Sequence, residues 1–368
     1  MRTNMINTTN TQENLSGLKR EDFKKTIDGK STDLFILKNK NGMEIAVTNY
    51  GAATLAIMVP DKNGNYANVI LGHDSIENVI KSPEPFLSTT IGRYGNRIAK
   101  GKFTLLGKEY SLAINNGPNS LHGGPTGFHT AVWDAEQTDE QTVEFKHTSQ
   151  DGEEGFPGKL TVNMTYSLTD NNEFTITYKA TTDKTTIVNL TNHGFFNLAG
   201  IANPTPTVLN NILTINADYF IPIDEVSIPF GEIIKVAGTP FDFRTPHVVG
   251  ERIDDKDQQT VNGTGYDHCF VLNKKEPGEL SFAAKCVEPL SGRSMEVYTT
   301  EPGVQLYTGN WLNGFSGAHG TTFPARSAIC FEAQHFPDTP NKPHFPSVVL
   351  NPGEEYNQTT IYKFGIEK

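Results

Sequence analysis

Beyond about residue 20, apolar and polar residues alternate with a period of two along most of the chain. The clearest run begins at Leu160: positions 160, 162, 164, 166 and 168 are apolar or aromatic, and the positions between them are threonine, asparagine or serine. A turn at residues 170–172 separates this run from Phe174, Ile176 and Tyr178. Side chains of a β-strand point alternately to its two faces, so the pattern predicts an antiparallel pair with one buried face.

Two further pairs of short apolar runs flank the turn dipeptides Asn41-Gly42 and Gly107-Lys108. Asparagine and glycine tolerate the positive φ angles that tight hairpin turns require, so each pair predicts a β-hairpin. The strands expected around these turns cover residues 34–38, 43–47, 103–106 and 109–112.

No helical period of 3.6 residues persists over more than a couple of turns, which argues against the parallel βαβ folds that bind nucleotides. The phosphate-binding motifs G-x-G-x-x-G and G-x-x-x-x-G-K-[ST] are also missing. No linker or low-complexity tract follows the first twenty or so residues. We therefore expect an all-β protein with a polar lead-in over residues 1–20 and one large antiparallel β-sandwich domain over residues 21–368, with few short helices.

The formal net charge is −11, from 31 basic and 42 acidic residues, without a run of like charge. This balance argues against binding to nucleic acid or anionic membranes, and it disfavours a phosphorylated substrate. No stretch reaches the roughly 18 apolar residues of a membrane span. The polar N-terminus also lacks the apolar stretch of a secretory signal, so we expect a cytoplasmic protein, or a periplasmic one if a signal peptide has been removed.

The three cysteines, Cys269, Cys286 and Cys330, lie far apart in the sequence. They lack the paired spacing of a zinc site or a disulfide framework. Buried free thiols are therefore expected.

Glu332 is a carboxylate inside an apolar run, residues 328–333, that predicts a buried strand. At the mouth of such a strand a carboxyl group is partly desolvated, which raises its pKa and makes it a better base near neutral pH. Taken alone, a satisfied carboxylate at a strand end would be the better explanation. His193 reverses that balance, because it lies among amides and aromatics in residues 189–200. An acid and a base in two such settings indicate proton transfer on a polar, hydroxyl-rich substrate.

Three more segments concentrate polar side chains among glycines and prolines, namely residues 92–98, 115–124 and 263–272. In the last of them, Asp267 opens an apolar strand. Taken one at a time, they are also explained by ordinary turns, surface arginines and a structural histidine.

In sequence order, these segments resemble the aldose 1-epimerases, the galactose mutarotase family, over nearly the whole chain. The number of ordered motifs makes a chance match improbable, and the resemblance implies the family's large β-sandwich, the galactose mutarotase-like supersandwich. The matching motifs are G-R-x-x-N-R-I at 92–98, L-H-G-G at 121–124, T-N-H-x-x-F-N-L at 191–198, A-D-x-x-x-P-x-D at 217–224, I-P-x-G at 228–231, Y-D-H at 266–268, G-V-Q-L-Y-T at 303–308, C-x-E-x-Q at 330–334 and P-G-E at 352–354.

The resemblance implies that Glu332 is a general base and His193 a general acid. The expected reaction interconverts the α and β anomers of free aldohexoses such as galactose and glucose. The base takes the proton of the C1 hydroxyl while the acid protonates the ring oxygen, and the opened ring recloses after rotation about C1–C2. The residues implied as ligands of the sugar hydroxyls are Asn96, Arg97, His122, Asp267 and Gln305.

This scheme needs no metal or organic cofactor, and the histidines at 122, 193 and 335 lack the spacing of a helical zinc motif. The expected partner is a small monosaccharide, bound by a monomer or a homodimer. The chain departs from the family at Phe195, Cys269 and Ala333, where many members carry tyrosine, asparagine and threonine. These departures affect the finer hydrogen bonding and leave the acid and the base untouched.

Two other classes of protein remain open on the sequence alone. A lectin could use the same hydroxyl ligands without needing both an acid and a base. A glycoside hydrolase could use Glu332 and Asp267 as its two carboxylates, which would have to lie about 5–5.5 Å or 6.5–9.5 Å apart across a glycosidic bond. Within the family, a hexose-6-phosphate epimerase would need further cations near the pocket, and the motif segments add only Arg93.

Overall fold

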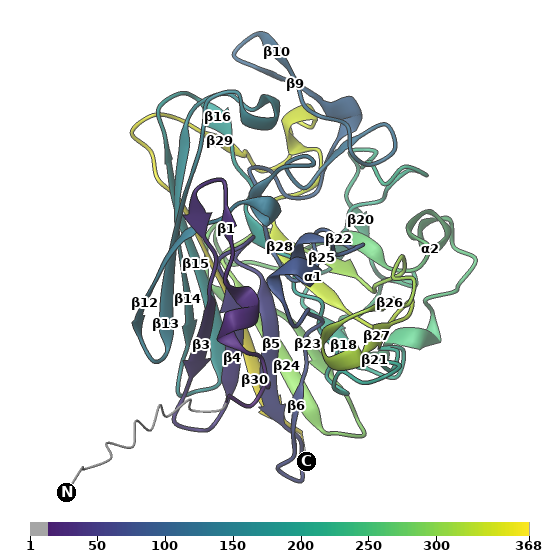
Figure 1. The fold of residues 1–368 in the computed structure, drawn as a ribbon. Helices are drawn as coiled ribbons and strands as arrows, with labels where there is room; N and C mark the ends of the chain where they lie inside the picture. Colours follow the sequence, from purple (N-terminus) through teal and green to yellow (C-terminus); the bar gives the residue numbers. More distant parts are fainter. Residues whose placement is uncertain (1–13, 368) are drawn as a thin grey trace, which may run out of the picture.

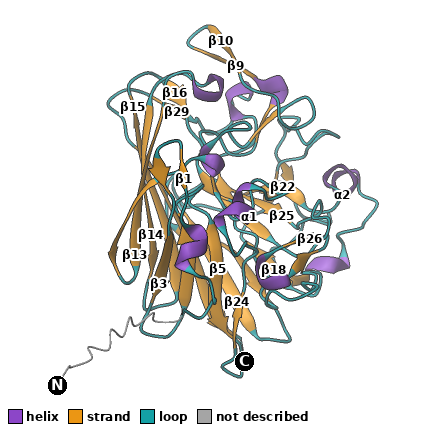
Figure 2. Cartoon of the chain, in the orientation of Figure 1, coloured by secondary structure: helices purple, strands orange, loops and turns teal. Residues whose placement is uncertain are grey.

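The computed structural model describes residues 14–367. Strands dominate these residues, and the two α-helices among them, α1 (Ile76–Ile80) and α2 (Gln258–Gly263), are at most six residues long (Figure 2). The predicted all-β fold with few short helices is confirmed. Of the predicted lead-in, residues 1–13 lie outside the described part of the chain. Within the described part, no helix combines the length and the apolar character needed to span a membrane.

Three large antiparallel sheets form the framework (Figure 1). The nine-stranded sheet has the order β12 (Asp134–Asp139), β13 (Thr142–Ser149), β14 (Leu160–Leu168), β15 (Glu173–Thr182), β30 (Tyr356–Ile366), β24 (Arg293–Thr299), β23 (Ser281–Val287), β18 (Ile212–Ile215) and β21 (His247–Val248). The four-stranded sheet has the order β3 (Leu34–Lys38), β4 (Glu44–Thr48), β5 (Thr54–Pro60) and β6 (Tyr66–Asn68). The five-stranded sheet has the order β20 (Ile234–Lys235), β19 (Tyr219–Phe220), β22 (Asp267–Val271), β25 (Gly303–Tyr307) and β28 (Cys330–Gln334).

Short two-stranded ribbons connect or flank these sheets, and the ribbon of β8 with β11 contains the predicted site residue Arg97. The ribbons are β1 (Thr26–Ile27) with β2 (Lys30–Ser31), β7 (Thr90–Ile91) with β17 (Thr191–Asn192), β8 (Arg97–Ile98) with β11 (Ser120–Leu121), β9 (Lys102–Leu105) with β10 (Lys108–Ser111), β16 (Thr186–Ile187) with β29 (Val349–Leu350), and β26 (Phe315–Ser316) with β27 (Thr322–Phe323).

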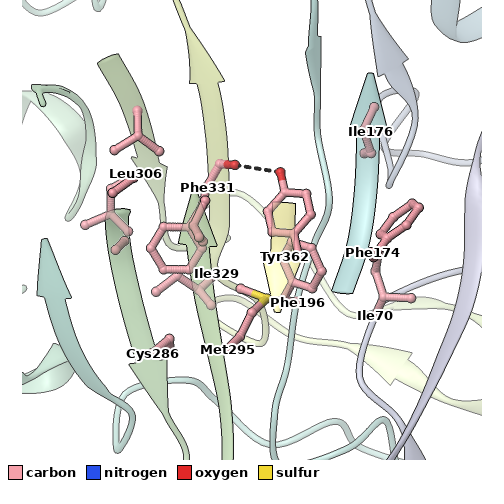
Figure 3. Close-up of a cluster of buried hydrophobic side chains, with 14 of the residues drawn as sticks. Ile70, Phe174, Ile176, Phe196, Cys286, Met295, Leu306, Ile329, Phe331 and Tyr362 are labelled. Atoms are coloured by element: carbon pink, nitrogen blue, oxygen red, sulfur yellow. Dashed lines mark hydrogen bonds between the residues drawn. The ribbon is translucent and has the colours of Figure 1, made fainter. Parts of the chain in front are cut away.

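One continuous apolar core joins the three large sheets, because each contributes buried side chains to the same cluster. β14 and β15 pair over their whole lengths, from Leu160 opposite Thr182 to Leu168 opposite Phe174, and their alternate residues are buried as the pattern predicted. Figure 3 shows Phe331 of β28 near Tyr362 of β30, whose hydroxyl donates a hydrogen bond of 2.9 Å to the carbonyl oxygen of Phe331. This bond links the five-stranded sheet to the nine-stranded sheet inside the core.

All three cysteines are buried and free, which confirms the expectation from their spacing. Cys286 belongs to the same core as the large sheets.

Both predicted hairpins form, but their turns differ from the expected dipeptides. The second turn is centred on Leu106 and Gly107, both at positive φ (52° and 77°), and Lys108 already pairs with Leu105 at the start of β10. Leu106, predicted as the end of a strand, is therefore an exposed turn residue, because glycine takes the second turn position. In the first hairpin, the last pair is Lys38 with Glu44, so five residues form the loop and the turn is longer than Asn41-Gly42 alone.

Replacing Phe331 by alanine should lower the free energy of unfolding by about 3–5 kcal/mol, because the fully packed core cannot close the cavity left by the ring. Chemical denaturation followed by circular dichroism measures this. The control is Leu106→Ala, whose side chain is 83% exposed and should change stability by no more than about 0.5 kcal/mol. A loss below about 1 kcal/mol for Phe331→Ala would contradict the assignment of this residue to the core.

Candidate active site

The two faces of β28 belong to two different environments. Ile329 and Phe331 point into the core, whereas Glu332, on the opposite face, is 2% exposed and lines a cavity. Glu332 was predicted at the mouth of a strand, and this is wrong: it lies in the middle of β28. β28 continues past Glu332 because it pairs with β25 as far as Gln334, opposite Gly303.

Side chains from three neighbouring strands form the floor of this cavity. Gln305 of β25 pairs directly with Glu332, and Asp267 opens β22 as predicted. The amide nitrogen of Gln305 donates a hydrogen bond of 2.7 Å to Asp267, which also lies 3.9 Å from the guanidinium of Arg97. Gln305 is buried and does not itself line the cavity, whereas its neighbours Asp267 and Glu332 do.

His193 faces the carboxyl group of Glu332. It follows β17, and its Nε2 atom lies 3.6 Å from Oε1 of Glu332. Its ring stacks on Phe195 with centroids 4.7 Å apart and an interplanar angle of 9°, and it meets the ring of His122 edge-on at 5.1 Å. The Phe195 that replaces the family's usual tyrosine therefore supports the imidazole by packing.

Asn96 and His122 hold each other through their backbones. The N–H of Asn96 donates to Nδ1 of His122 at 3.0 Å, and the N–H of His122 donates to the carbonyl oxygen of Asn96 at 3.1 Å. Because Nδ1 accepts a hydrogen bond, the neutral ring carries its proton on Nε2 and can donate it to a ligand. Gly123 follows at φ 83°, where a Cβ atom would lie 2.1 Å from the carbonyl oxygen of Gly92. Only glycine fits there, which explains that residue of the L-H-G-G motif.

The two arginines of the G-R-x-x-N-R-I segment have different surroundings. Arg97 lies at the cavity wall, and its Nε donates to Oδ1 of Asn116 at 2.9 Å. Arg93 is buried outside the cavity and donates to the carbonyl oxygens of Pro157 and Gly158 at 2.6 and 2.7 Å. The alternative that these arginines lie on the surface is therefore wrong for Arg93, and Arg93 adds no cation to the cavity.

The cavity has a volume of about 530 Å³, within the usual range for small-molecule sites. Six of the seven predicted site residues line it, and Gln305 is the exception. Residues of the lining that the sequence did not single out are Glu84, Pro85, Phe86, Glu225, Val226, Ser227, Tyr307 and Trp311. Tyr307 could have been found, since it lies two residues after Gln305 on the same face of β25.

A larger cavity, of about 700 Å³, lies on a different part of the molecule and is lined by polar and apolar residues in similar numbers. None of the seven predicted residues lines it. Its buried polar pair, Glu301 with His335 at 2.6 Å, is therefore separate from the acid–base pair of Glu332 and His193.

Burial shifts the pKa values of the acid–base pair in opposite directions. It raises the pKa of Glu332 well above that of a free carboxyl group, and the negative charge of Asp267 raises it further while Arg97 opposes the shift. Burial lowers the pKa of His193 to about 3. Both shifts have the same cause, since loss of water destabilises the charged form of either group. Without a ligand, the proton that the pair shares therefore rests on Glu332.

Three groups in the cavity could approach a metal ion. His122, His193 and Glu332 each offer a ligand atom, and these atoms lie within 4.8 Å of one another. Ligands around a tetrahedral zinc ion at the usual 2.0–2.1 Å lie about 3.3 Å apart, so this set would have to contract to hold one. The absence of a metal stays an expectation from the sequence.

Known proteins resemble this chain over most of its length. The family model for aldose 1-epimerase matches residues 33–363. Galactose mutarotase from Bos taurus is 46% identical over 325 residues, which cover 88% of this chain and 92% of that protein. Aldose 1-epimerase from Escherichia coli is 38% identical over 340 residues, which cover 92% of this chain and 96% of that protein. A crystal structure of a GalM/aldose epimerase homologue from C. elegans superposes with a TM-score of 0.84 at 30% identity, covering 92% of this chain and 100% of the other. The chain belongs to the aldose 1-epimerase family.

Proposed function

We propose that this cavity interconverts the α and β anomers of free aldohexoses such as galactose and glucose, with Glu332 as the general base and His193 as the general acid. One observation carries the assignment of roles: the two buried groups face each other at 3.6 Å within a polar cavity. The family membership and the relatives named galactose mutarotase and aldose 1-epimerase support the activity.

In this mechanism, Glu332 removes the proton of the C1 hydroxyl and His193, protonated, gives its proton to the ring oxygen. The ring opens to the aldehyde, C1 rotates about the C1–C2 bond, and reclosure reverses both transfers. Each transfer by a positioned group typically contributes about 10²–10⁴-fold to the rate. Asn96, Arg97 and His122 would hold the sugar hydroxyls by hydrogen bonds.

The protonation preference of the pair favours the open-chain stage of this mechanism. Burial favours a neutral carboxyl on Glu332 and a neutral imidazole on His193. That is the state of the two groups after the ring has opened, because Glu332 has then gained a proton and His193 has lost one. From the reactive form, burial therefore favours ring opening. The same burial disfavours both the formation of that reactive form and the reclosure of the ring.

The competing classes explain less of this geometry. A lectin has no use for a base and an acid facing each other in a desolvated site. In a hydrolase, Asp267 would have to act across a glycosidic bond from Glu332, but Asp267 is engaged by Gln305 and Arg97 while His193 faces Glu332. The proposal therefore gives Asp267 a binding role.

The central experiment is polarimetry of freshly dissolved α-D-galactose and α-D-glucose with the purified protein. Glu332→Gln keeps the shape of the side chain but removes its basic oxygen, so kcat should fall at least about 10²-fold. His193→Asn should be similarly inactive. The double variant should be little worse than either single variant, since the two groups act as a unit.

Three results would count against the assignment. Near wild-type activity of Glu332→Gln would exclude it as the base. Release of nitrophenol from a nitrophenyl galactoside at a rate comparable with mutarotation would indicate a hydrolase. Binding of galactose without any rate enhancement in the wild type would indicate a lectin.

A separate prediction concerns binding. Arg97→Ala should lower kcat/KM for galactose at least about tenfold, because a hydrogen bond to a charged group contributes about 1.5–3 kcal/mol. Arg97→Lys should fall between alanine and wild type, since it keeps the charge beside Asp267 but loses the planar fork that also reaches Asn116. Thermal unfolding controls for folding, and unchanged kinetics in Arg97→Ala would exclude a substrate contact.

The pH dependence of kcat/KM tests the protonation of the pair. The reactive form, with Glu332 ionised and His193 protonated, carries the same single proton as the favoured form, so the rate should stay level wherever the pair holds one proton. The acid limb, where a second proton binds, should lie near the lowered His193 pKa of about 3. The alkaline limb should follow the raised pKa of Glu332. With circular dichroism as a check on folding, an acid limb at the ordinary carboxyl pKa of about 4.3 would contradict this order.

A further inference from the structure

The cavity lining holds more carboxyl groups than the proposed reaction uses. Arg97 is its one guanidinium and lies beside Asp267, so these two charges offset each other. Burial lowers the pKa of both His122 and His193, which leaves them uncharged near neutral pH. Against this single cation the lining presents four carboxyl groups, those of Glu84, Glu225, Asp267 and Glu332.

Glu84 is the buried carboxyl group without a role in the mechanism. It lies between Pro83 and Pro85, whose rings restrict the backbone, and its Oε1 accepts a hydrogen bond of 3.2 Å from the N–H of Phe86. The ring of Phe86 packs edge-on against His122 with centroids 4.7 Å apart. These contacts hold the half-buried carboxyl of Glu84 at the cavity wall.

The surroundings of Glu84 offer no compensating charge. Burial raises its pKa to about 7, and the hydrogen bond from Phe86 is the opposing influence. On its other side, Glu84 borders a small space lined by His73 and His129, and burial lowers the pKa of each to about 4, so both are neutral. The negative charge of Glu84 also raises the pKa of Glu332, and both carboxyl groups line the same cavity.

We propose that Glu84 selects substrates by charge, so that the enzyme accepts aldohexoses carrying a protonated amine and rejects sugars carrying a carboxylate or phosphate. The inference rests on the proposed mutarotase function of the same cavity. A cation near an uncompensated, partly desolvated carboxylate is attracted strongly, a neutral hydroxyl weakly, and an anion is repelled.

The test compares three sugars of similar size: galactose, 2-amino-2-deoxygalactose and galacturonic acid. Anomer exchange is measured by NMR saturation transfer at about pH 7.5, where more than half of Glu84 is ionised and more than half of the amine is still protonated. For each enzyme, kcat/KM for the amino sugar and for the uronic acid is divided by kcat/KM for galactose. A lower folded fraction in a variant lowers all three values equally and therefore cancels from these ratios. In the wild type, the amino sugar should reach at least about one third of the galactose value and the uronic acid less than about one tenth, because a carboxylate in the cavity wall attracts an ammonium group and repels another carboxylate.

Glu84→Gln keeps the shape and removes the charge. It should lower the amino-sugar ratio and raise the uronic-acid ratio, each by about fivefold or more, while Glu84→Asp keeps the charge and should stay closer to wild type. The matched control is Glu225→Gln: Glu225 is an exposed carboxyl at the same cavity, so salt screens it and both ratios should change less than about twofold.

The outcomes separate the two proposals. If the wild type does not exchange the anomers of galactose, the proposed function fails. If galactose is exchanged but Glu84→Gln leaves both ratios within about twofold of wild type, or Glu225→Gln shifts them equally, the charge-selecting role of Glu84 is overturned while the mutarotase function stands.

Discussion

The alternation of side chains along β28 ties the chemistry of this protein to its core. Ile329 and Phe331 are packed among aromatic side chains from the nine-stranded sheet, and Glu332 must therefore point the other way, into the cavity. Because the core is close-packed, the strand has little freedom to shift or twist. The carboxyl group of Glu332 is therefore held in a fixed position. Proton transfer requires the base to lie within a fraction of an ångström of its productive position relative to the substrate.

That placement has a cost in stability. Among the described residues, Oε2 of Glu332 and Nδ1 of His193 are buried without a hydrogen-bond partner. An unsatisfied buried polar group costs about 1–3 kcal/mol, so the free site is locally unfavourable. The same desolvation sets the pKa order of the pair, so the shared proton must move from Glu332 to His193 before the proposed reaction can begin.

Much of the fold follows from local patterns, whereas the site depends on relations between distant segments. The alternation around Leu160 fixes the faces of β14 and β15, because half-buried strands leave a periodic trace. The same kind of pattern could not place Glu332 within β28. A strand that is buried on both faces shows no alternation of apolar and polar residues, so its ends cannot be predicted from such a pattern. Leu106 was misplaced because turn positions depend on φ, which residue type only biases. Glu84 was missed because no motif surrounds it and its importance comes from neighbours far away in sequence.

The residues around the cavity come from separate segments between Glu84 and Glu332, spread across ribbons and a sheet whose strands are not consecutive in the chain. Contacts at such sequence separation have a high contact order and form late, after the chain has closed several long loops. No short fragment of the chain can assemble the cavity by itself. Recovery of activity on refolding therefore reports that the whole β-sandwich has formed. A partly folded chain that contains only some of the β-strands would have no catalytic activity.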